Sequence, residues 1–552
     1  MAFASGPSSL GFDAGASEVP RAFVRYIEDL VKALKSGHTA RALNLYENGR
    51  REINAEHFSK KLWPTLEQVN AAVAASSGAR LDRGFEAVYQ TLWLKHVFMT
   101  DMITLPEKDT LSNLVRAWTS YSAFIEECVG PSPMAGYTLP PDWVYDVVNE
   151  FVYLFQRFHE ERAARFHRRA EAAKSGSEAP AGFEADDALD AAAEGVWDPR
   201  AVLALLRRAV LTSGINEQLA AARTKGVRAA LAEWRAPEVT QLAGTFALVC
   251  LVRVEAKLGD HAAAVEAARF LSPQSSGAFL RVTRAQLSLY SYLGFSLAML
   301  GRFHDAARAI SSVLLLVHRA SPVLEDGARS SRFMKKTAEK MLALLALCDA
   351  LSPGAPVDEL VRAKATDRFG AKLTGIAAGG TEAEAAIADL FTAATPSFVD
   401  ASWPPVAPAA EGASAGEQVF AVQSRIFLSA AQARAAELAG IRSLLRLYKT
   451  IDVPKLARLA GVTEDRARAG LVALKLHSWQ AVASSADAAD AASRPALTRA
   501  IRDSVHFVVG GEDGSMVASS EARVSEDATR ELIRRTVALK RQIGAASPAG
   551  RA

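Results

Sequence analysis

Cysteine is scarce in this chain of 552 residues, which contains only Cys128, Cys250 and Cys348. The three cysteines lie far apart, are odd in number and share no short spacing. This pattern argues against a disulfide framework and against a zinc site, and it suits a reducing compartment. A chain of this length can bury one long core or two to three domains.

The chain also lacks an excess of charge of one sign. Its 64 basic and 61 acidic residues leave a formal net charge of +3, so no whole-chain field draws it to nucleic acid or membrane. The first twenty residues lack the basic region and apolar run of a secretory signal. The most apolar stretches, Phe246–Val254 and Leu342–Leu347, are too short to span a membrane. We therefore expect a cytoplasmic protein with no membrane contact.

Motifs that carry catalysis are almost absent. The chain has no phosphate-binding loop, dinucleotide-binding glycine fingerprint or zinc-protease helix. The stretch Gly412–Gly416 fits the Gly-x-Ser-x-Gly nucleophile elbow around Ser414, but no β-branched strand precedes it, as that motif requires. His159 and His167 lie eight residues apart on a helix, too far to share a metal, and we expect both at the surface. The sequence thus predicts no catalytic residue, cofactor, metal or small-molecule substrate.

Helical periodicity dominates the rest of the chain. Apolar residues recur at three- and four-residue steps, as between Phe23 and Leu34, and Asp142–Phe166 reads as a strongly patterned helix entered through Pro141. This predicts a mainly α fold. The segments are a disordered tail (1–19), an N-terminal helical region (20–169), a low-complexity insertion or linker (170–195), a helical-repeat solenoid (196–403), a flexible linker (404–416), the end of the helical array with a winged helix (417–524), and a C-terminal interaction helix with a tail (525–552).

An internal repeat indicates the solenoid. The pattern Leu-Gly-x-x at Gly259 recurs at Gly301. A small residue, Ala264 or Ala306, stands at the same place after each glycine. The period fits two helices with their turns, as in right-handed, TPR-like arrays in which each helix pair covers the next. We expect each glycine at a sharp turn and each alanine buried where two helices approach closely.

The stretch Ile441–Trp479 predicts three short helices. They cover Arg442–Tyr448, Val453–Leu459 and Glu464–Lys475, with a turn at Gly461 and an N-cap at Thr463. Downstream, alternating apolar residues from Val505, a glycine-rich turn and a short apolar run from Met516 indicate a hairpin. Three helices with such a hairpin make a winged helix. Its third helix begins with Glu464 and Asp465, which disfavours base reading in DNA and favours protein docking.

Five arginines cluster near the end of the Asp142–Phe166 helix. Cations at a helix C-terminus are favourable on dipole grounds alone, so a solvated helix end is the first interpretation. Contact with RNA or with an acidic partner is the alternative. The residues are Arg157, Arg162, Arg165, Arg168 and Arg169.

The last apolar helix of the chain is the strongest interaction candidate. Acidic residues open the segment Glu526–Ile543, and Lys540 and Arg541 close it. It either packs on its own chain or is offered to helices of partner proteins, and we favour partners because no later element covers it. Its apolar face consists of Leu532, Ile533, Thr536, Leu539 and Ile543.

Several blocks together resemble the family of l subunits of eukaryotic translation initiation factor 3, within the wider class of PCI proteins of the proteasome lid, signalosome and initiation factor. The resemblance runs along roughly residues 20–545 and is carried by Leu139–Phe158, Ser213–Leu219, Gly244–Leu271, Tyr292–Arg319, Met341–Cys348 and Ile441–Gly461. It implies a winged-helix PCI module after the solenoid, and no enzymatic activity.

The resemblance further implies a scaffold subunit in the PCI/MPN core of the initiation factor. Expected partners are the other subunits, especially e and k, and the 40S ribosomal subunit within the 43S preinitiation complex. In that family the winged helices join in an arc and the C-terminal helices form a bundle. Two alternatives stay open: a PCI scaffold of the proteasome lid or signalosome, and a nucleic-acid-binding winged-helix protein.

Overall fold

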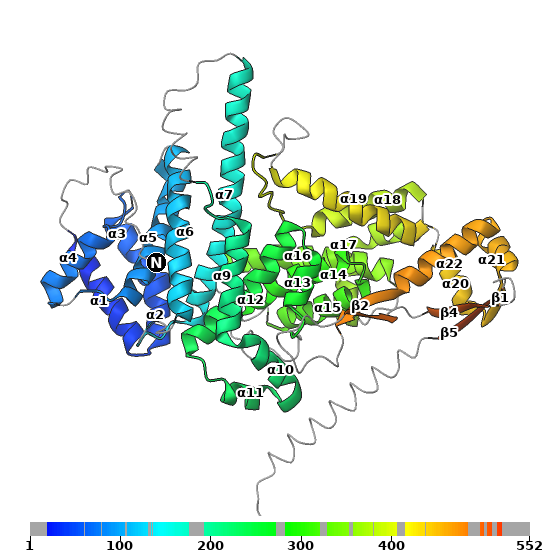
Figure 1. Ribbon diagram of the computed structural model, residues 1–552, viewed down its shortest axis with the longest axis horizontal. Helices are drawn as coiled ribbons and strands as arrows, with labels where there is room; N and C mark the ends of the chain where they lie inside the picture. The colour runs from blue at the N-terminus through cyan, green and yellow to red at the C-terminus, as the bar shows by residue number, and fades with distance from the viewer. Residues whose placement is uncertain are drawn as a thin grey trace, which may run out of the picture. The chain divides into compact units, whose positions relative to one another are not determined.

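The computed structural model describes most of the chain. The described residues are 19–59, 61–78, 80–104, 107–130, 134, 136–175, 193–271, 282–320, 328–352, 357–378, 380–405, 415–436, 438–483, 497–501, 505–510 and 516–521. They form helices almost throughout, with short strands only near the end of the described part (Figure 1). The prediction of a mainly α protein is confirmed.

The chain divides into two compact units. Unit 1 comprises Met1–Leu251 with Gly277–Val282 and Ala401–Ala407, and unit 2 comprises Val252–Ser276, Thr283–Asp400 and Pro408–Ala552. The segment boundaries expected from the sequence, and the right-handed sense of the array, stay predictions.

Unit 1 is built from helices whose inner faces are aliphatic and aromatic. Its elements are α1 (Arg21–Lys35), α2 (Thr39–Asn44), the π-helix η1 (Leu45–Gly49), α3 (Arg50–His57), α4 (Leu66–Ser77), α5 (Arg83–Thr104), α6 (Glu107–Val129), α7 (Pro141–Ser175), α9 (Pro199–Ser213), α10 (Ile215–Lys225), α11 (Val227–Glu233) and the first part of α12 (Glu238–Leu258).

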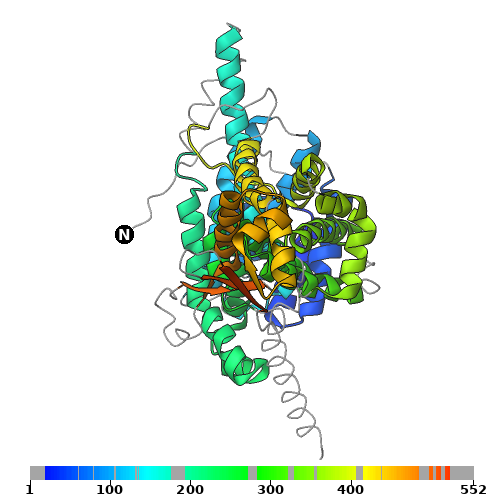
Figure 2. The same cartoon turned by 90° about the vertical axis from the view of Figure 1, so that its right-hand side faces the viewer.

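The longest of these helices is α7. Pro141 opens it as predicted, because the first helical position needs no N–H donor. Trp143, Phe151, Phe155 and Phe158 are fully buried along one side. The helix continues to Ser175, well beyond the predicted end, since the alanines, arginines and glutamate after Phe166 are good helix formers. Figures 1 and 2 show this end of α7 extending past the other helices of unit 1.

A turn after residue 192 completes the core beside α7. Trp197 is fully buried, and its Nε1 donates to the carbonyl oxygen of Leu114 at 2.7 Å. Its own carbonyl oxygen lies 3.1 Å from Nε2 of His159. The expected surface position of His159 was therefore wrong, because the ring fills the space under this turn. His167 is half-buried.

Unit 2 continues the helices in sequence order, and neighbours in the chain pack against each other, α14 on α15, α15 on α16 and α17 on α18. After the end of α12, its array consists of α13 (His261–Ala267), α14 (Thr283–Met299), α15 (Phe303–Ala320), α16 (Ala328–Leu351), α17 (Glu359–Ala378), α18 (Gly380–Ala394) and α19 (Ala415–Ala436).

The repeat residues lie where the sequence places them. Gly259 and Gly301 adopt φ of +85° and +71°, the left-handed conformation that ends a helix sharply. Ala264 and Ala306 are fully buried, as expected. Helices α14 and α15 approach even more closely at Gly294, where a Cβ atom would lie 2.6 Å from Cγ1 of Ile310.

The apolar stretch Phe246–Val254 belongs to a longer helix than expected. By length and composition, α12 is the one described helix that meets the requirements for a membrane span, contrary to the sequence estimate. Inside the protein, 89% of its most apolar window is buried, which is typical of a core helix.

The C-terminal module, residues 438–521, has the elements of the predicted winged helix. Its helices are α20 (Leu438–Leu447), α21 (Val453–Ala460) and α22 (Glu464–Ser478). Gly461, at φ +68°, ends α21, and Thr463 Oγ1 caps α22 by accepting from the Arg466 amide. The strands are β1 (Thr450–Asp452), β2 (Trp479–Ala483), β3 (Leu497–Ile501), β4 (Val505–Gly510) and β5 (Met516–Glu521).

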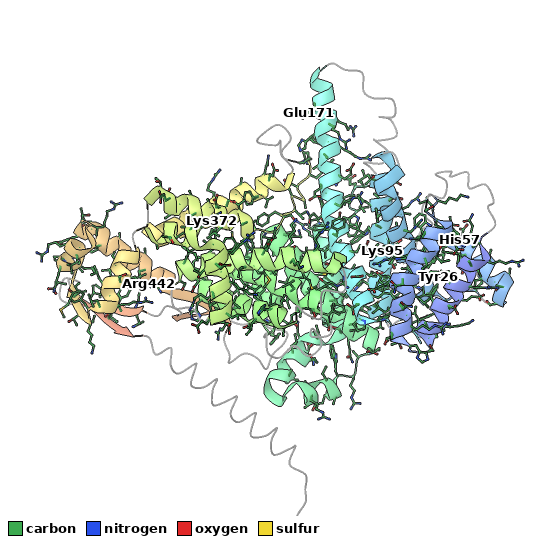
Figure 3. The ribbon with its side chains drawn as sticks, turned by 180° about the vertical axis from the view of Figure 1, so that it is seen from behind. Tyr26, His57, Lys95, Glu171, Lys372 and Arg442 are labelled. Atoms are coloured by element: carbon green, nitrogen blue, oxygen red, sulfur yellow. The ribbon has the colours of Figure 1, made fainter. Side chains whose placement is uncertain are left out.

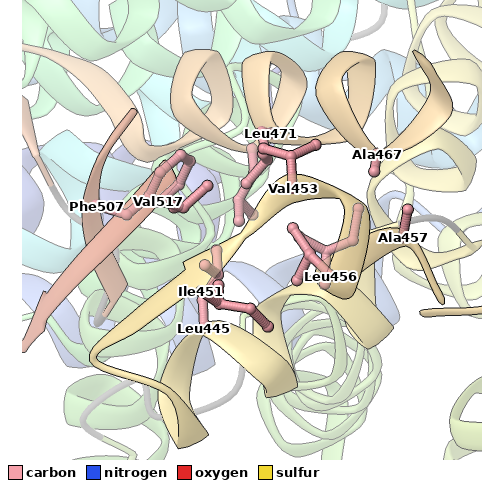
Figure 4. Packing of buried hydrophobic residues seen from close by; sticks show 11 residues of the cluster. Leu445, Ile451, Val453, Leu456, Ala457, Ala467, Leu471, Phe507 and Val517 are labelled. Atoms are coloured by element: carbon pink, nitrogen blue, oxygen red, sulfur yellow. The ribbon is translucent and has the colours of Figure 1, made fainter. Parts of the chain in front are cut away.

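The strands form two antiparallel ladders. The first has the order β1-β5-β4, in which Ile451 pairs with Val517 and Val509 with the same Val517 from the other side. The predicted hairpin is β4–β5, whereas β1 and the separate β2–β3 ladder were not foreseen. Leu456 of α21, Leu471 of α22 and Phe507 of β4 pack in one hydrophobic core (Figure 4).

Ser414 of the Gly-x-Ser-x-Gly match lies outside the described residues. Its last glycine does not lie in a flexible linker, because Gly416 is in the first turn of α19. A Cβ atom there would lie 2.8 Å from the carbonyl oxygen of Phe398. This glycine allows the close packing of a helix.

Candidate partner-binding surfaces

One arginine of the predicted cluster on α7 lies over an aromatic residue that the sequence did not single out. The guanidinium carbon of Arg162 lies 3.7 Å from the ring centroid of Trp403, and the Phe166 ring lies 5.5 Å from the same ring. One turn earlier, Arg157 lies over Phe98 at 5.4 Å. Trp403 remains 46% exposed, so part of this aromatic and cationic surface faces solvent.

The other arginines of the cluster have acidic or internal partners. Arg165 and Arg168 both reach Glu161 Oε1, at 3.2 and 3.4 Å. Arg169 is half-buried and also has an interaction partner. The cluster is therefore brought together, but part of its charge is neutralised within α7. Binding of RNA or of an acidic partner at this surface stays a prediction. Figure 3 shows Glu171 on the extended end of the same helix.

Among its described residues, the C-terminal module exposes six large apolar side chains. They come from all three helices and from the hairpin, and their exposed fractions range from 46% to 74%. Exposed apolar groups of this kind mark interaction surfaces when they lie together. We refer to them as the exposed apolar set: Leu447, Leu459, Val472, Val508, Val509 and Met516.

The sequence analysis did not single out this set, because apolar residues occupy both buried and exposed positions of these helices and strands. In β4, for example, Phe507 is buried while Val508 is 57% exposed. On α22, Glu464 and Asp465 are exposed at the leading end, as predicted, beside exposed Arg466. The mixed charge at this end suits a protein surface better than a DNA groove.

The predicted partner-binding face of the C-terminal helix lies outside the described residues. Leu532, Ile533, Thr536, Leu539 and Ile543 therefore stay a prediction.

A half-buried polar cluster joins η1, α5 and α7 in unit 1. Lys95 Nζ lies 3.2 Å from Glu150 Oε2 and donates to Tyr46 Oη at 2.7 Å, and Tyr46 in turn donates to Asp146 Oδ2 at 3.4 Å. Burial lowers the pKa of Lys95, but Glu150, Tyr46 and Asp146 outweigh it and hold that pKa above its usual value. Burial likewise raises the pKa of Tyr46. Both groups stay protonated, and the cluster holds three helices together.

The remaining chemistry-bearing groups are buried or scattered. All three cysteines are buried and lie outside any disulfide, and burial raises the pKa of Cys128 and Cys348, which keeps them as thiols. Within the described ranges, no group of three or more His, Cys, Asp or Glu side chains is placed to hold a metal ion.

Comparison with known proteins adds a family. A family model described as RNA polymerase I-associated factor PAF67 matches residues 113–538. Relatives named eukaryotic translation initiation factor 3 subunit L occur in Gallus gallus and Homo sapiens, each 27% identical over 438 residues that cover 78% of this chain and 71% of theirs. The relative of that name in Mycosarcoma maydis is 27% identical over 458 residues, 81% of this chain and 64% of its own. These names agree with the resemblance carried by the sequence blocks. Since the family model covers more than half of the chain, the chain belongs to the family of RNA polymerase I-associated factor PAF67.

Proposed function

We propose that this chain is a non-catalytic scaffold subunit of eukaryotic translation initiation factor 3. The observation that carries the proposal is the similarity to proteins named subunit L along 78% of the chain. In this role the chain contributes to the PCI/MPN core of the factor and to formation of the 43S preinitiation complex on the 40S subunit, in the cytoplasm.

The arrangement of the surfaces supports a scaffold. The helical array encloses its own core, while the C-terminal module keeps the exposed apolar set in water. A surface of that kind is stabilised by a partner protein. We propose the other subunits of the factor, especially e and k, as these partners, with the segment Glu526–Ile543 adding a helix to a shared bundle.

A second candidate follows from the description of the family model, which names RNA polymerase I. A protein of that role would associate with the polymerase in the nucleus. A PCI scaffold of the proteasome lid or signalosome is a third candidate, and a free nucleic-acid-binding winged-helix protein is a fourth.

One purification separates these candidates. The full chain, tagged at its N-terminus and expressed at its natural level, is captured from separate cytosolic and nuclear extracts, and its partners are identified by mass spectrometry. We expect other initiation factor 3 subunits and 40S ribosomal proteins in the cytosolic sample. Recovery of polymerase I subunits, proteasome or signalosome subunits, or chromatin in their place would contradict the proposal.

A further inference from the structure

Three exposed cations and an exposed aromatic ring lie close together in the sequence of α16, in unit 2. The cations are Arg332, Lys335 and Lys336, and the ring is that of Phe333, whose side chain is 48% exposed. Met334, which stands among them, is buried. We refer to the four exposed residues as the α16 patch.

The spacing of the α16 patch places its side chains on one side of the helix. Residues three and four apart are neighbours on a helix surface, so Lys336 lies beside both Arg332 and Phe333. Lys335 lies beside Arg332 for the same reason. The buried Met334 lies on the opposite side, toward the core. The solvent side of this part of α16 is therefore formed by three cations and one ring.

The charge of the α16 patch is not compensated by an ion pair. Arg332, Lys335 and Lys336 form none with any acidic side chain among the described residues. Glu339, the acid that follows them on the helix, lies 3.8 Å from Arg368 of α17. Like charges three or four residues apart destabilise a helix, so the stability of α16 does not explain this arrangement.

Cations on the neighbouring helix α17 are arranged differently. Arg362 lies 3.1 Å from Asp349 of α16, and Lys372 lies 3.0 Å from Asp389 of α18. Each of these cations connects two helices of the array. The cations of the α16 patch connect no helices and leave their charge in the solvent.

We propose that the α16 patch binds single-stranded RNA. The three cations contact phosphates, and a base stacks on the ring of Phe333. Proteins that bind single strands combine these two features, cations along the nucleic-acid backbone and an aromatic ring for a base, and neither feature requires a particular sequence. The patch begins after the first turn of α16, so the free backbone amides at the start of the helix take no part.

The exposed ring favours RNA over an acidic segment of a protein. A carboxylate pairs with the cations alone and leaves the ring of Phe333 in water, whereas a nucleotide uses both. The ring also favours a single strand over a duplex, because only unpaired bases can be splayed out and stacked on an aromatic side chain. The inference goes beyond the proposed scaffold function and does not rest on it, since it concerns the isolated chain.

The test measures binding of the full chain to a short fluorescein-labelled oligouridylate by fluorescence anisotropy, over a series of salt concentrations. The matched probes are an abasic oligomer of the same length, which keeps the phosphates and lacks the bases, and a glutamate peptide of the same charge. Lys336→Gln and Phe333→Ala change the patch. The control variant Arg425→Gln removes an exposed cation from α19. Circular dichroism confirms that each variant is folded.

We expect the two patch variants to differ in kind. Lys336→Gln should weaken binding of both the RNA and the abasic oligomer, and should reduce the slope of log affinity against log salt by about 0.7, the contribution of one phosphate contact. Phe333→Ala should weaken RNA binding about fivefold or more, the loss of one stacked base, while the salt slope and the binding of the abasic oligomer stay unchanged. Arg425→Gln should change none of these quantities.

Three results would overturn the proposal. The first is absence of oligouridylate binding by the unchanged chain. The second is equal behaviour of Lys336→Gln and Arg425→Gln, or a loss in Phe333→Ala that is as large for the abasic oligomer as for the RNA. The third is tighter binding of the glutamate peptide that is lost in the same variants, which would assign the α16 patch to an acidic protein in place of RNA.

Discussion

The amide nitrogen of Gln423 lies where a side chain on Gly259 would begin: a Cβ atom built on that glycine is 2.6 Å from Nε2 of Gln423. The same amide presents its Oε1 to Nε2 of His261 at 3.2 Å, and Nδ1 of His261 lies 3.3 Å from the hydroxyl of Ser296. With the proton on Nε2, the imidazole donates to Gln423 and accepts from Ser296. These contacts connect α19, the last helix of the array, to the first repeat.

Replacing Gly259 with alanine should destabilise unit 2 more than replacing Gly301. Both glycines have positive φ, which costs an alanine roughly 1–2 kcal/mol. Only at Gly259 must Gln423 move away and lose its bond to His261, a further cost of about 1 kcal/mol. Urea unfolding followed by circular dichroism measures the difference. Nothing lies within 4 Å of a Cβ on Gly301. Equal losses of unfolding free energy in the two variants would therefore contradict a stabilising contact between Gln423 and His261.

Ala306→Trp should overpack the contact between α14 and α15. Ala306 is fully buried, and extra volume in a packed core costs about 1–3 kcal/mol, so the melting temperature and the solubility should both fall. Ala430→Trp is the matched control because Ala430 is exposed on α19. If Ala306→Trp melts like the unchanged chain, the repeat has been placed incorrectly.

Stability should fall as the pH is lowered from 6.5. Burial lowers the pKa of His96 and of His261 below that usual value, so below pH 6.5 the unfolded chain binds protons that the folded chain does not. The contribution of each neutral imidazole is therefore present above pH 6.5 and is lost as the pH falls toward the folded pKa. Comparing melting temperatures across this range with those of His261→Gln isolates one histidine. An identical pH slope in that variant would show that His261 does not contribute.

Two neighbouring residues of β4 should respond differently to substitution. Phe507→Ala removes a buried ring and should cost about 3–5 kcal/mol, whereas Val508→Thr on the exposed side should change stability by less than about 0.5 kcal/mol. Val508→Asp should fold normally but reduce co-purification with other subunits if the exposed apolar set is an interface. Full co-purification of Val508→Asp would argue against a partner at this strand.

Deleting residues 525–552 should leave a folded chain that no longer enters the complex. Leu532→Asp with Leu539→Asp should do the same, because each charge buried in a helix bundle costs several kcal/mol. The matched control is Arg534→Asp with Arg541→Asp, which introduces the same two aspartates on the opposite side of the expected helix. Co-purification and circular dichroism are measured together. Unfolding of the isolated double-leucine variant would instead mean that the helix packs within its own chain.

Local sequence rules predicted the features that depend on neighbouring residues. The turn glycines Gly259, Gly301 and Gly461 and the cap at Thr463 follow from the demands of helix ends, which extend over a few residues only. The predicted end of α7 was wrong. The run after Phe166 is rich in alanine and charged residues and was interpreted as a linker, although the same composition favours a helix.

Features that depend on distant contacts could not be derived in this way. Trp197 is buried because it bonds to Leu114, 83 residues earlier, which also draws His159 inside. Trp403 lies against Arg162, which is far from it in the sequence. No local periodicity encodes these neighbours.

The fastening of α19 to the first repeat also has a consequence for folding during synthesis. Gln423 follows His261 by 162 residues, so at roughly 5–20 residues per second the ribosome needs about ten to thirty seconds to deliver it. A simple stack of repeats can fold pair by pair as it emerges. In unit 2 the turn at Gly259 and the ring of His261 gain their partner only when a helix from the far end of the array has been made. A nascent chain that stalls before α19 therefore leaves that site open to solvent.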